Sequence, residues 1–281
     1  MNDSFSEVRY SPAEWRIISH PAQDGPSNMA VDEAIAEAVA AGRASSTLRF
    51  YAWQPGCLSL GYAQSAEDAL GERLAAYGWD IVRRLTGGRA ILHIDELTYS
   101  IVTPLDDPRV DGGVVESYRR LSQGLMNGLA ALGAPVHAGK AKESARGFNG
   151  PVCFEVPSDY EITSGGKKLL GSAQTRRGGV VLQHGALPLF GDITRIVDVL
   201  AFEDDDERES ARSRLLGRAI TLEEALGRVA SFEEAAEALT GGLRDALCLD
   251  LTPGALTPEE QSRAEELRVS KYASAEWTKR H

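Results

Sequence analysis

Two glycines flanked by arginines make up the first segment whose residue types suit binding of a charged group. It reads Arg83-Arg84-Leu85-Thr86-Gly87-Gly88-Arg89-Ala90-Ile91-Leu92-His93. Glycines let backbone N–H groups approach a ligand, and guanidinium groups form charge-assisted hydrogen bonds with carboxylates or phosphates. The spacing fits neither a P-loop nor a dinucleotide-binding GxGxxG motif. The segment therefore indicates a site for an anionic group, the alternative being an ordinary glycine turn with surface arginines.

Cys153 is a candidate nucleophile in the aperiodic stretch 138–158, which also contains lysine and arginine. Neighbouring cations favour the thiolate form of a cysteine, and the thiolate is the attacking species. The alternative is a structural cysteine. Cys57 and Cys248 lie in apolar runs, and we predict that both belong to the core. Three widely spaced cysteines without a CxxC pair argue against a disulfide framework or a zinc site and favour a reducing, cytoplasmic location.

Lys168 and Ser172 belong to the segment Gly166-Lys167-Lys168-Leu169-Leu170-Gly171-Ser172-Ala173-Gln174. Strand alternation places Lys168, Leu170 and Ser172 on one face, which indicates a surface that faces a ligand. The alternative is a hairpin strand with a solvent-exposed lysine. His93 and His184 have no partners at metal-ligand spacing, so we predict no metal site. A GxSxG serine nucleophile is also absent from the sequence.

Runs of alternating or continuous apolar residues predict the elements that position these segments. We expect strands at 15–18, 47–53, 57–61, 80–84, 90–93, 97–103, 160–163, 168–173 and 180–189, and helices at 29–41, 65–78, 114–132 and 222–239. Ser27 or Asn28 is the expected cap of the first helix. A hairpin across Gln54-Pro55-Gly56 and a meander after residue 160 are expected. The order predicts an α+β fold with a mixed, largely antiparallel sheet flanked by helices.

Composition and charge exclude several classes of protein. The 281 residues include 30 basic and 41 acidic side chains, a net charge of −11, which argues against a nucleic-acid partner. No apolar window reaches the roughly 18 residues of a membrane span, and the N-terminus lacks the pattern of a secretory signal. Residues 140–177 hold seven basic and four acidic side chains, which suits an anionic ligand or an acidic partner. We predict one domain over 1–250 and a C-terminal helix and tail over 251–281.

Taken together, these segments resemble the biotin/lipoate protein ligase superfamily. Residues 83–93 are similar to its RRxTGGxAxxH lipoate-binding loop, 167–174 to its GKKxxGSAQ strand, and 182–185 to its QHG segment. Met29-Ala30-Val31-Asp32-Glu33 matches its MAxDE helix. The resemblance covers residues 15–190 in the family's order and extends, more loosely, to Lys271-Tyr272 and Trp277.

Within the superfamily, the chain is most similar to octanoyltransferases that use a cysteine. Residues 153–162, Cys-Phe-Glu-Val-Pro-Ser-Asp-Tyr-Glu-Ile, resemble their active-site signature. ATP-dependent lipoate ligases carry an Arg-Gly-Asn-Asp stretch in this region, which Arg146-Gly147-Phe148-Asn149 matches only in part. Arg89 stands where many ligases have a third glycine, and it is typical of the cysteine enzymes.

The resemblance implies a fold like the catalytic domain of class II tRNA synthetases and a reaction without a cofactor. An octanoyl group would pass from acyl carrier protein to a lysine of a lipoyl-domain protein, namely the glycine cleavage H protein. Cys153 would hold the group as a thioester, and Lys168 would stabilise its thiolate. An apolar tunnel at Gly87, Gly88 and the 168–173 strand would take the acyl chain, with Arg84, His93 and His184 at its mouth. The implied substrate-binding residues are Arg84, Thr86, Gly87, Gly88, Ala90, His93, Gly171, Ser172, Ala173 and His184.

Three other functions remain open from the sequence. An ATP-dependent lipoate ligase would form AMP and would not depend on Cys153. An octanoyl amidotransferase would take its acyl group from an octanoylated lipoyl protein. A non-catalytic lipoyl- or biotinyl-binding module would bind without turnover.

Overall fold

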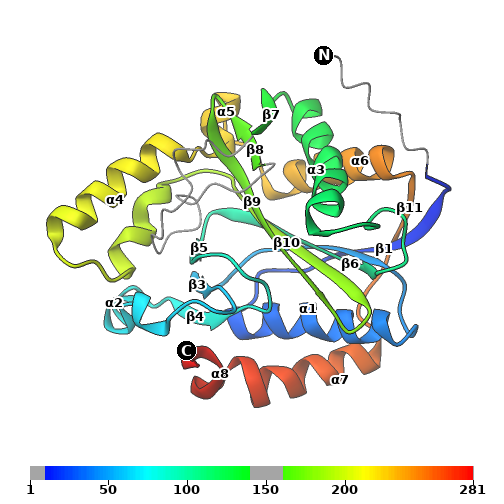
Figure 1. Cartoon of the computed structure of the whole chain (residues 1–281), viewed down its shortest axis with the longest axis horizontal. Helices are drawn as coiled ribbons and strands as arrows, with labels where there is room; N and C mark the ends of the chain where they lie inside the picture. Colours follow the sequence, from blue (N-terminus) through cyan, green and yellow to red (C-terminus); the bar gives the residue numbers. More distant parts are fainter. Residues whose placement is uncertain (1–9, 140–160, 281) are drawn as a thin grey trace.

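Two β-sheets carry the fold in the computed structural model, which describes residues 10–139 and 161–280 (Figure 1). The larger sheet has eight strands in the order β11-β1-β2-β6-β10-β9-β8-β7, and the smaller has three in the order β4-β3-β5. β1 pairs in parallel with β11 and β2, whereas the successive pairs from β2 to β7 are antiparallel. The predicted α+β class with a mixed, largely antiparallel sheet is confirmed. The strands are β1 (Ala13–Ser19), β2 (Thr47–Tyr51), β3 (Cys57–Leu60), β4 (Asp80–Arg83), β5 (Ile91–His93), β6 (Glu96–Pro104), β7 (Val136–Gly139), β8 (Glu161–Ser164), β9 (Lys167–Arg177), β10 (Val180–Pro188) and β11 (Leu249–Pro253).

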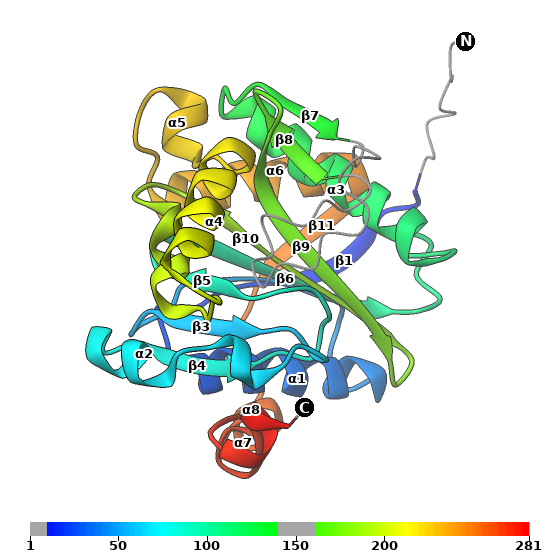
Figure 2. The same ribbon diagram turned by 60° about the vertical axis from the view of Figure 1, so that its left-hand side comes forward.

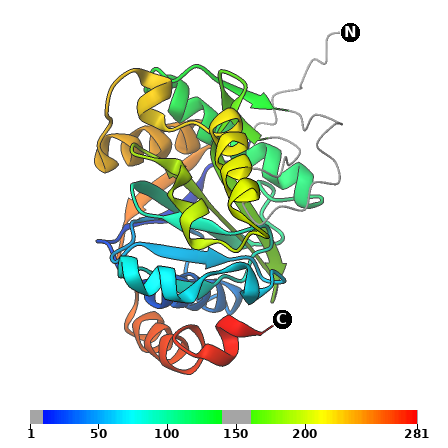
Figure 3. The same ribbon diagram turned by 90° about the vertical axis from the view of Figure 1, so that its left-hand side faces the viewer.

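Helices cover both faces of the larger sheet. On one side lies α1 (Gly25–Ala40), with α7 (Pro258–Leu267) and α8 (Ala275–Lys279) outside it (Figure 2). On the other side α3 (Val114–Ala131) packs against α6 (Phe232–Leu247), and Figure 3 shows both at the end opposite α7. The other helical segments are η1 (Ala66–Asp68), α2 (Gly71–Tyr77), η4 (Ile193–Val199), α4 (Asp205–Arg218), α5 (Leu222–Leu226) and η5 (Arg268–Tyr272). No helix in the described ranges has the length and apolarity of a membrane span.

The first helix begins earlier than its apolar pattern predicts. Asp24, rather than Ser27 or Asn28, is the N-cap, and its carboxylate accepts a hydrogen bond from the Ser27 N–H at 2.7 Å. Pro26 occupies the first turn, where its missing N–H costs nothing. The early start places Met29 and Asp32 in the second turn, where both are buried.

The hairpin predicted across Gln54-Pro55-Gly56 is wrong. β2 already pairs with β1 on one edge and β6 on the other. β3 therefore has no free edge of β2 to join, and it pairs with β4 and β5 in the smaller sheet. The chain thus crosses from one sheet to the other between Tyr51 and Cys57.

Strict alternation along β9 is also wrong near Lys168. Lys168 pairs with Thr163 and Leu170 pairs with Ile162, so the register shifts and Leu169 is an extra residue. Such a bulge redirects the side chains on its two sides. Leu169 and Leu170 are both fully buried in the same apolar core. Lys168, Leu170 and Ser172 therefore do not share one unbroken face.

The two described cysteines differ in their surroundings. Cys57 is fully buried, as predicted. The prediction for Cys248 is wrong, because that thiol is exposed. Cys248 ends α6 in a left-handed conformation with φ 53°, and the turn directs its side chain outward while Leu247 and Leu249 stay buried.

The C-terminal segment returns to the first helix. β11 includes residue 250, at which we placed the division, and it pairs with β1 of the larger sheet. The division between a domain over 1–250 and a C-terminal segment over 251–281 stays a prediction. Lys271 and Tyr272 both donate hydrogen bonds to Glu33 of α1 at 2.7 Å. Trp277 donates its indole N–H to the Arg83 carbonyl at 2.9 Å. The C-terminal residues of the family resemblance thus contact its opening helix and its glycine loop.

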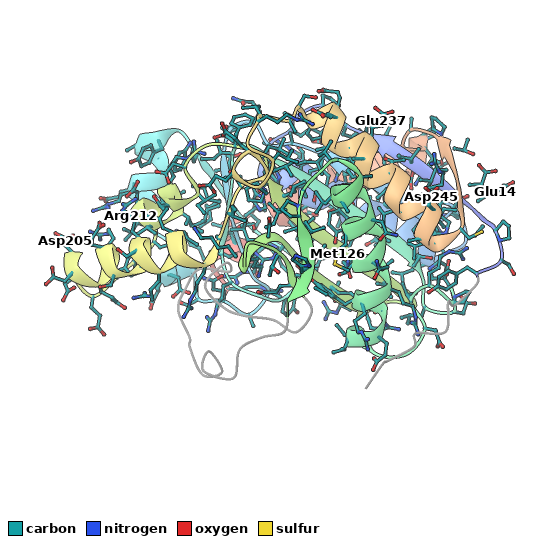
Figure 4. All side chains as sticks on the ribbon, turned by 90° about the horizontal axis from the view of Figure 1, so that it is seen from above. Glu14, Met126, Asp205, Arg212, Glu237 and Asp245 are labelled. Carbon is teal, nitrogen blue, oxygen red and sulfur yellow. The ribbon has the colours of Figure 1, made fainter. Side chains whose placement is uncertain are left out.

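Gly242 sets the distance between α6 and α3. A Cβ atom at Gly242 would lie 2.2 Å from the Gly128 nitrogen and 2.3 Å from the Gly124 oxygen. The neighbouring Gly241 has no such contact, since its Cβ would lie 4.0 Å from the nearest atom, on the Arg244 side chain. Figure 4 shows the two helices side by side, with Glu237 and Asp245 on α6.

Gly242→Ala should lower the free energy of unfolding by about 1–3 kcal/mol, because the two helix backbones must separate. Gly241→Ala is the matched control and should raise it by about 0.5–1 kcal/mol, because alanine favours the helix. Urea unfolding followed by circular dichroism measures both. Equal effects of the two substitutions would contradict the close packing described.

Candidate functional site

A narrow cavity lies between the larger and the smaller sheet, and we call it the inter-sheet cavity. Its lining residues are Met29, Tyr51, Trp53, Ser59, Arg84, Ile91, His93, Thr98, Gly171, Ser172, Ala173, His184, Gly185 and Ala186. Ile91, Ser172 and Ala173 are half-buried and form the rim, whereas the other lining residues are buried. The cavity measures about 20 Å³, which is enough for a water molecule. A longer ligand therefore requires the lining side chains to move.

Six of the predicted substrate-binding residues line this cavity: Arg84, His93, Gly171, Ser172, Ala173 and His184. Four others do not. Thr86 is buried beside the cavity and contacts His184, while Gly87 and Gly88 are exposed in the loop before β5. Ala90 is fully buried in the core between β3, η4 and α4. The three residues expected at the mouth, Arg84, His93 and His184, are buried in the wall.

The two predicted catalytic residues are placed differently. Cys153 lies outside the described residues. Lys168 is buried three positions before Gly171, and its Nζ lies 2.8 Å from Glu161 Oε1. Side-chain exposures of 6% and 13% place this ion pair where solvent screens it weakly. Lys168 is therefore held by Glu161 near the start of β9, and it is not among the residues that line the inter-sheet cavity.

Asp32 is the centre of a buried polar network behind the cavity. Its carboxylate accepts hydrogen bonds from Arg49 at 2.7 Å, Tyr51 at 2.9 Å and Ser100 at 2.8 Å. Burial raises the pKa of Asp32, but Arg49 and then His184 lower it, and the result is about 2. Asp32 is therefore ionised, and its charge joins α1 to β2 and β6.

His184 extends this network to the glycine loop. Its Nδ1 lies 3.6 Å from Asp32 Oδ2, and its Nε2 lies 2.6 Å from Thr86 Oγ1. Burial lowers the pKa of His184 more than Asp32 raises it, so the ring is neutral near pH 7. A proton on Nδ1 facing Asp32 leaves Nε2 to accept from the Thr86 hydroxyl. The histidine thus fixes the loop against β10.

His93 belongs to a second chain of hydrogen bonds on the other side of the cavity. Its Nδ1 lies 2.6 Å from Glu96 Oε1, and its Nε2 lies 2.8 Å from Ser59 Oγ. Arg84 donates to the same Ser59 oxygen at 3.1 Å. The ring also stacks on Trp53, with centroids 4.0 Å apart and planes at 13°. Glu96, Ser59 and Trp53 thus hold His93 in one orientation in the wall of the cavity.

The arginines of the glycine segment bind backbone carbonyls of the protein itself. Arg84 Nη2 donates to the carbonyls of Gly87 and Arg89 at 2.9 and 2.8 Å. Arg83 is fully buried and donates to the carbonyls of Gly61 at 2.7 Å and Thr278 at 2.8 Å. The expectation that both guanidinium groups serve an anionic ligand is therefore wrong for Arg83. Buried carbonyls need donors, and the two arginines fill this need around the loop.

Several lining and supporting residues were missed by the sequence analysis: Met29, Asp32, Tyr51, Trp53, Ser59, Ile91, Thr98, Gly185 and Ala186. Signals for some of them were present. Met29 and Asp32 lie three apart in the MAxDE segment, which is one face of a helix. Arg49 inside the apolar run of β2 indicates a buried charge that needs an acidic partner.

The chain matches the model of the lipoyl protein ligase A/B catalytic domain over residues 24–244. It is 43% identical over 272 residues to the octanoyltransferase LipM of Moorella thermoacetica, covering 96% of this chain and 99% of the relative. It is 42% identical over 270 residues to the octanoyltransferase LipM of Exiguobacterium sibiricum, covering 94% and 98%.

Solved structures show the same fold. A structure of a bi-partite lipoate protein ligase and its E2 lipoyl domain from Thermoplasma acidophilum gives a TM-score of 0.80 at 25% identity, covering 95% of this chain and 96% of the other. A lipoate-protein ligase A bound with ATP gives 0.78 at 26% identity, covering 95% and 99%.

His20 makes the buried network sensitive to pH. Its Nδ1 accepts a hydrogen bond from Arg49 Nε at 2.9 Å. Burial and then the charge of Arg49 lower the pKa of His20 from 6.5 to about 4. Because the unfolded chain binds this proton first as the pH falls, stability should decrease from about pH 6.5 towards pH 4. The lowered pKa of His184 acts in the same direction.

His20→Asn keeps an oxygen acceptor for Arg49 but does not titrate. The variant should therefore lose less unfolding free energy than the wild type between pH 7.5 and pH 5, as measured by urea unfolding. His137→Asn, at an exposed position, is the control and should follow the wild type. Parallel profiles for His20→Asn and the wild type would refute this assignment.

Proposed function

Since the chain belongs to the lipoyl protein ligase A/B catalytic domain family, we propose that it transfers an octanoyl group from acyl carrier protein to a lipoyl-domain protein through a thioester on Cys153. It is an octanoyltransferase of lipoate biosynthesis, like the relative with which it is 43% identical over 96% of its length. The acceptor is a lysine of a lipoyl-domain protein, for which we propose the glycine cleavage H protein.

The inter-sheet cavity is the observation that carries the proposal. Its lining combines the motif residues with apolar side chains such as Met29, Ile91 and Ala186. Burial of an alkyl chain contributes about 0.8 kcal/mol per CH₂. Met29 is unbranched and lies in the lining, so a change of its rotamer can widen the cavity.

The reaction consists of two displacements at the same carbonyl carbon. In the first, the Cys153 thiolate attacks the carrier thioester, a new C–S bond forms, and the carrier leaves as a thiol after taking up a proton. In the second, the lysine amine attacks, the C–N bond of the amide forms, the Cys153 sulfur leaves, and the amine loses a proton. Neither step changes an oxidation state, and an amide is more stable than a thioester, so ATP is not consumed.

We propose that the Lys168 ammonium assists both steps. An ammonium near the sulfur stabilises the thiolate. Its ion pair with Glu161, at 2.8 Å, keeps this long side chain in one orientation. The free thiols of Cys57 and Cys248 are consistent with a reducing cytoplasm as the place of the reaction.

Incubation with octanoyl-acyl carrier protein should add one octanoyl mass to the protein, located on Cys153 by peptide mass spectrometry. Cys153→Ala should abolish the adduct and lower octanoyl transfer to the H protein by about a thousandfold or more, since the nucleophile is lost. Cys248→Ala removes the exposed thiol and is the control, which should behave as the wild type. Normal transfer by Cys153→Ala would exclude the thioester route.

Supplying each acyl source separately, with the same acceptor, tests the choice of donor. We expect transfer from octanoyl-acyl carrier protein without ATP. Transfer from free lipoate or octanoate only with ATP, with release of AMP, would identify a ligase instead. Transfer only from octanoylated H protein would identify an amidotransferase, and binding without transfer would identify a binding module.

Lys168→Met should move the pH profile of Cys153 alkylation to higher pH, because the thiolate loses a neighbouring cation. The measurement is made with iodoacetamide in the Cys248→Ala background, where Cys57 is buried. Lys167→Met removes a half-buried lysine one position away and should leave the profile unchanged. An unchanged profile for Lys168→Met would exclude this role of the ammonium.

A further inference from the structure

A second cavity, of about 50 Å³, adjoins the inter-sheet cavity. It lies among β5 and the turn after it, the end of β10, η4 and α4, and Ile91 and Leu92 of its lining belong to the glycine segment. Ile91 lines both cavities, and it is one of the three half-buried residues at the rim of the first. The second cavity therefore begins where the reacting end of a bound acyl group would lie.

Apolar side chains form most of the second cavity. Leu92, Ile193, Ile196 and Leu215 line it, and Phe190, which is 39% exposed, stands at its edge. The lining thus extends from the exposed side chain of Phe190 to Ile91, which also lines the inter-sheet cavity. A long, thin ligand could thus lead from the surface to the rim of the inter-sheet cavity.

The carboxylates that line the second cavity all have partners within the protein. Asp95 pairs with Arg195, and Asp192 accepts hydrogen bonds from the Thr194 N–H and hydroxyl at 2.7 Å. Glu96 is bonded to His93, as described above. An ammonium entering the cavity would find no unpaired carboxylate among the lining residues. The walls therefore favour an uncharged ligand over a lysine side chain.

From these observations, and resting on the proposed function, we infer that the second cavity binds the pantetheine arm of the carrier thioester. The arm is a long, uncharged chain with two amides and a dimethyl group, and its sulfur carries the acyl group. With the octanoyl chain in the inter-sheet cavity, the sulfur lies at the rim beside Ile91. The arm then continues over Ile91, its dimethyl group packs against the apolar wall, and it leaves past Phe190 towards the carrier.

Substitution of Ile193 by tryptophan tests the inference, because it fills the second cavity without touching the first. The measured quantity is the rate of octanoylation of the enzyme by three donors: octanoyl-acyl carrier protein, octanoyl-pantetheine and octanoyl-N-acetylcysteamine, which lacks most of the arm. Ile193→Trp should slow the first two about tenfold, as expected for a loss of about 1.4 kcal/mol of arm binding. The third donor and the transfer from octanoyl-enzyme to the acceptor should stay unchanged.

Val229→Trp adds the same bulk at a 56% exposed site between α5 and α6 and should leave all rates unchanged. Phe190→Asp, at the exposed edge, is a second variant that does not depend on repacking the core, and it should slow only the two donors that carry the arm. If Ile193→Trp lowers the melting temperature, the rates of Phe190→Asp with the three donors test the inference in its place.

Equal slowing of all three donors, or no slowing of any, would overturn the inference. Slower transfer to the acceptor, with unchanged octanoylation of the enzyme, would assign the second cavity to the lysine instead. Failure of the wild type to be octanoylated by any donor would overturn the proposed function itself, and is thereby distinguished from failure of the inference.

Discussion

The ion pair between Asp32 and Arg49 is the interaction on which the arrangement of the site depends. Both side chains are removed from water, which costs several kcal/mol per charge unless other groups solvate them. The protein supplies these groups from four elements, because Tyr51, Ser100, His184 and the carbonyl of Asn28 all contact the pair. The same contacts determine where β2, β6 and β10 lie relative to α1. The contacts that stabilise the buried charges therefore also determine the shape of the cavity.

The parts of the fold that follow from the sequence are those that local patterns determine. β6, β10 and α3 lie within one or two residues of their predicted bounds, because long apolar runs and a helical repeat leave little choice. Pairing between distant segments is different. Whether β3 joins β2 depends on β1 and β6, which no local pattern reveals. The outward turn of Cys248 and the bulge at Leu169 likewise result from contacts made elsewhere in the chain.

The predicted site shows the same division between local and distant information. Six lining positions were predicted correctly, because the family motifs mark residues that lie far apart in the sequence but line one cavity. The pattern did not give the tasks of the individual side chains. Arg83 and Arg84 hold carbonyl groups in place. The cavity is bounded by glycines, by apolar side chains and by rings that form hydrogen bonds within the protein. The apolar ligand that we propose is consistent with such a lining, whereas the charge of the arginines alone suggests an anion.

The bond between Arg83 and the Thr278 carbonyl joins residues that are 195 positions apart. A ribosome adding about 5–20 residues per second needs roughly 10–40 s to synthesise that stretch. During this interval the guanidinium group of the nascent protein lacks one of its final acceptors, and the glycine loop lacks the support that Trp277 later provides. Arg83 thus acquires these contacts only after residue 278 has been synthesised, and β4 and the glycine segment complete their packing later than the strands around them.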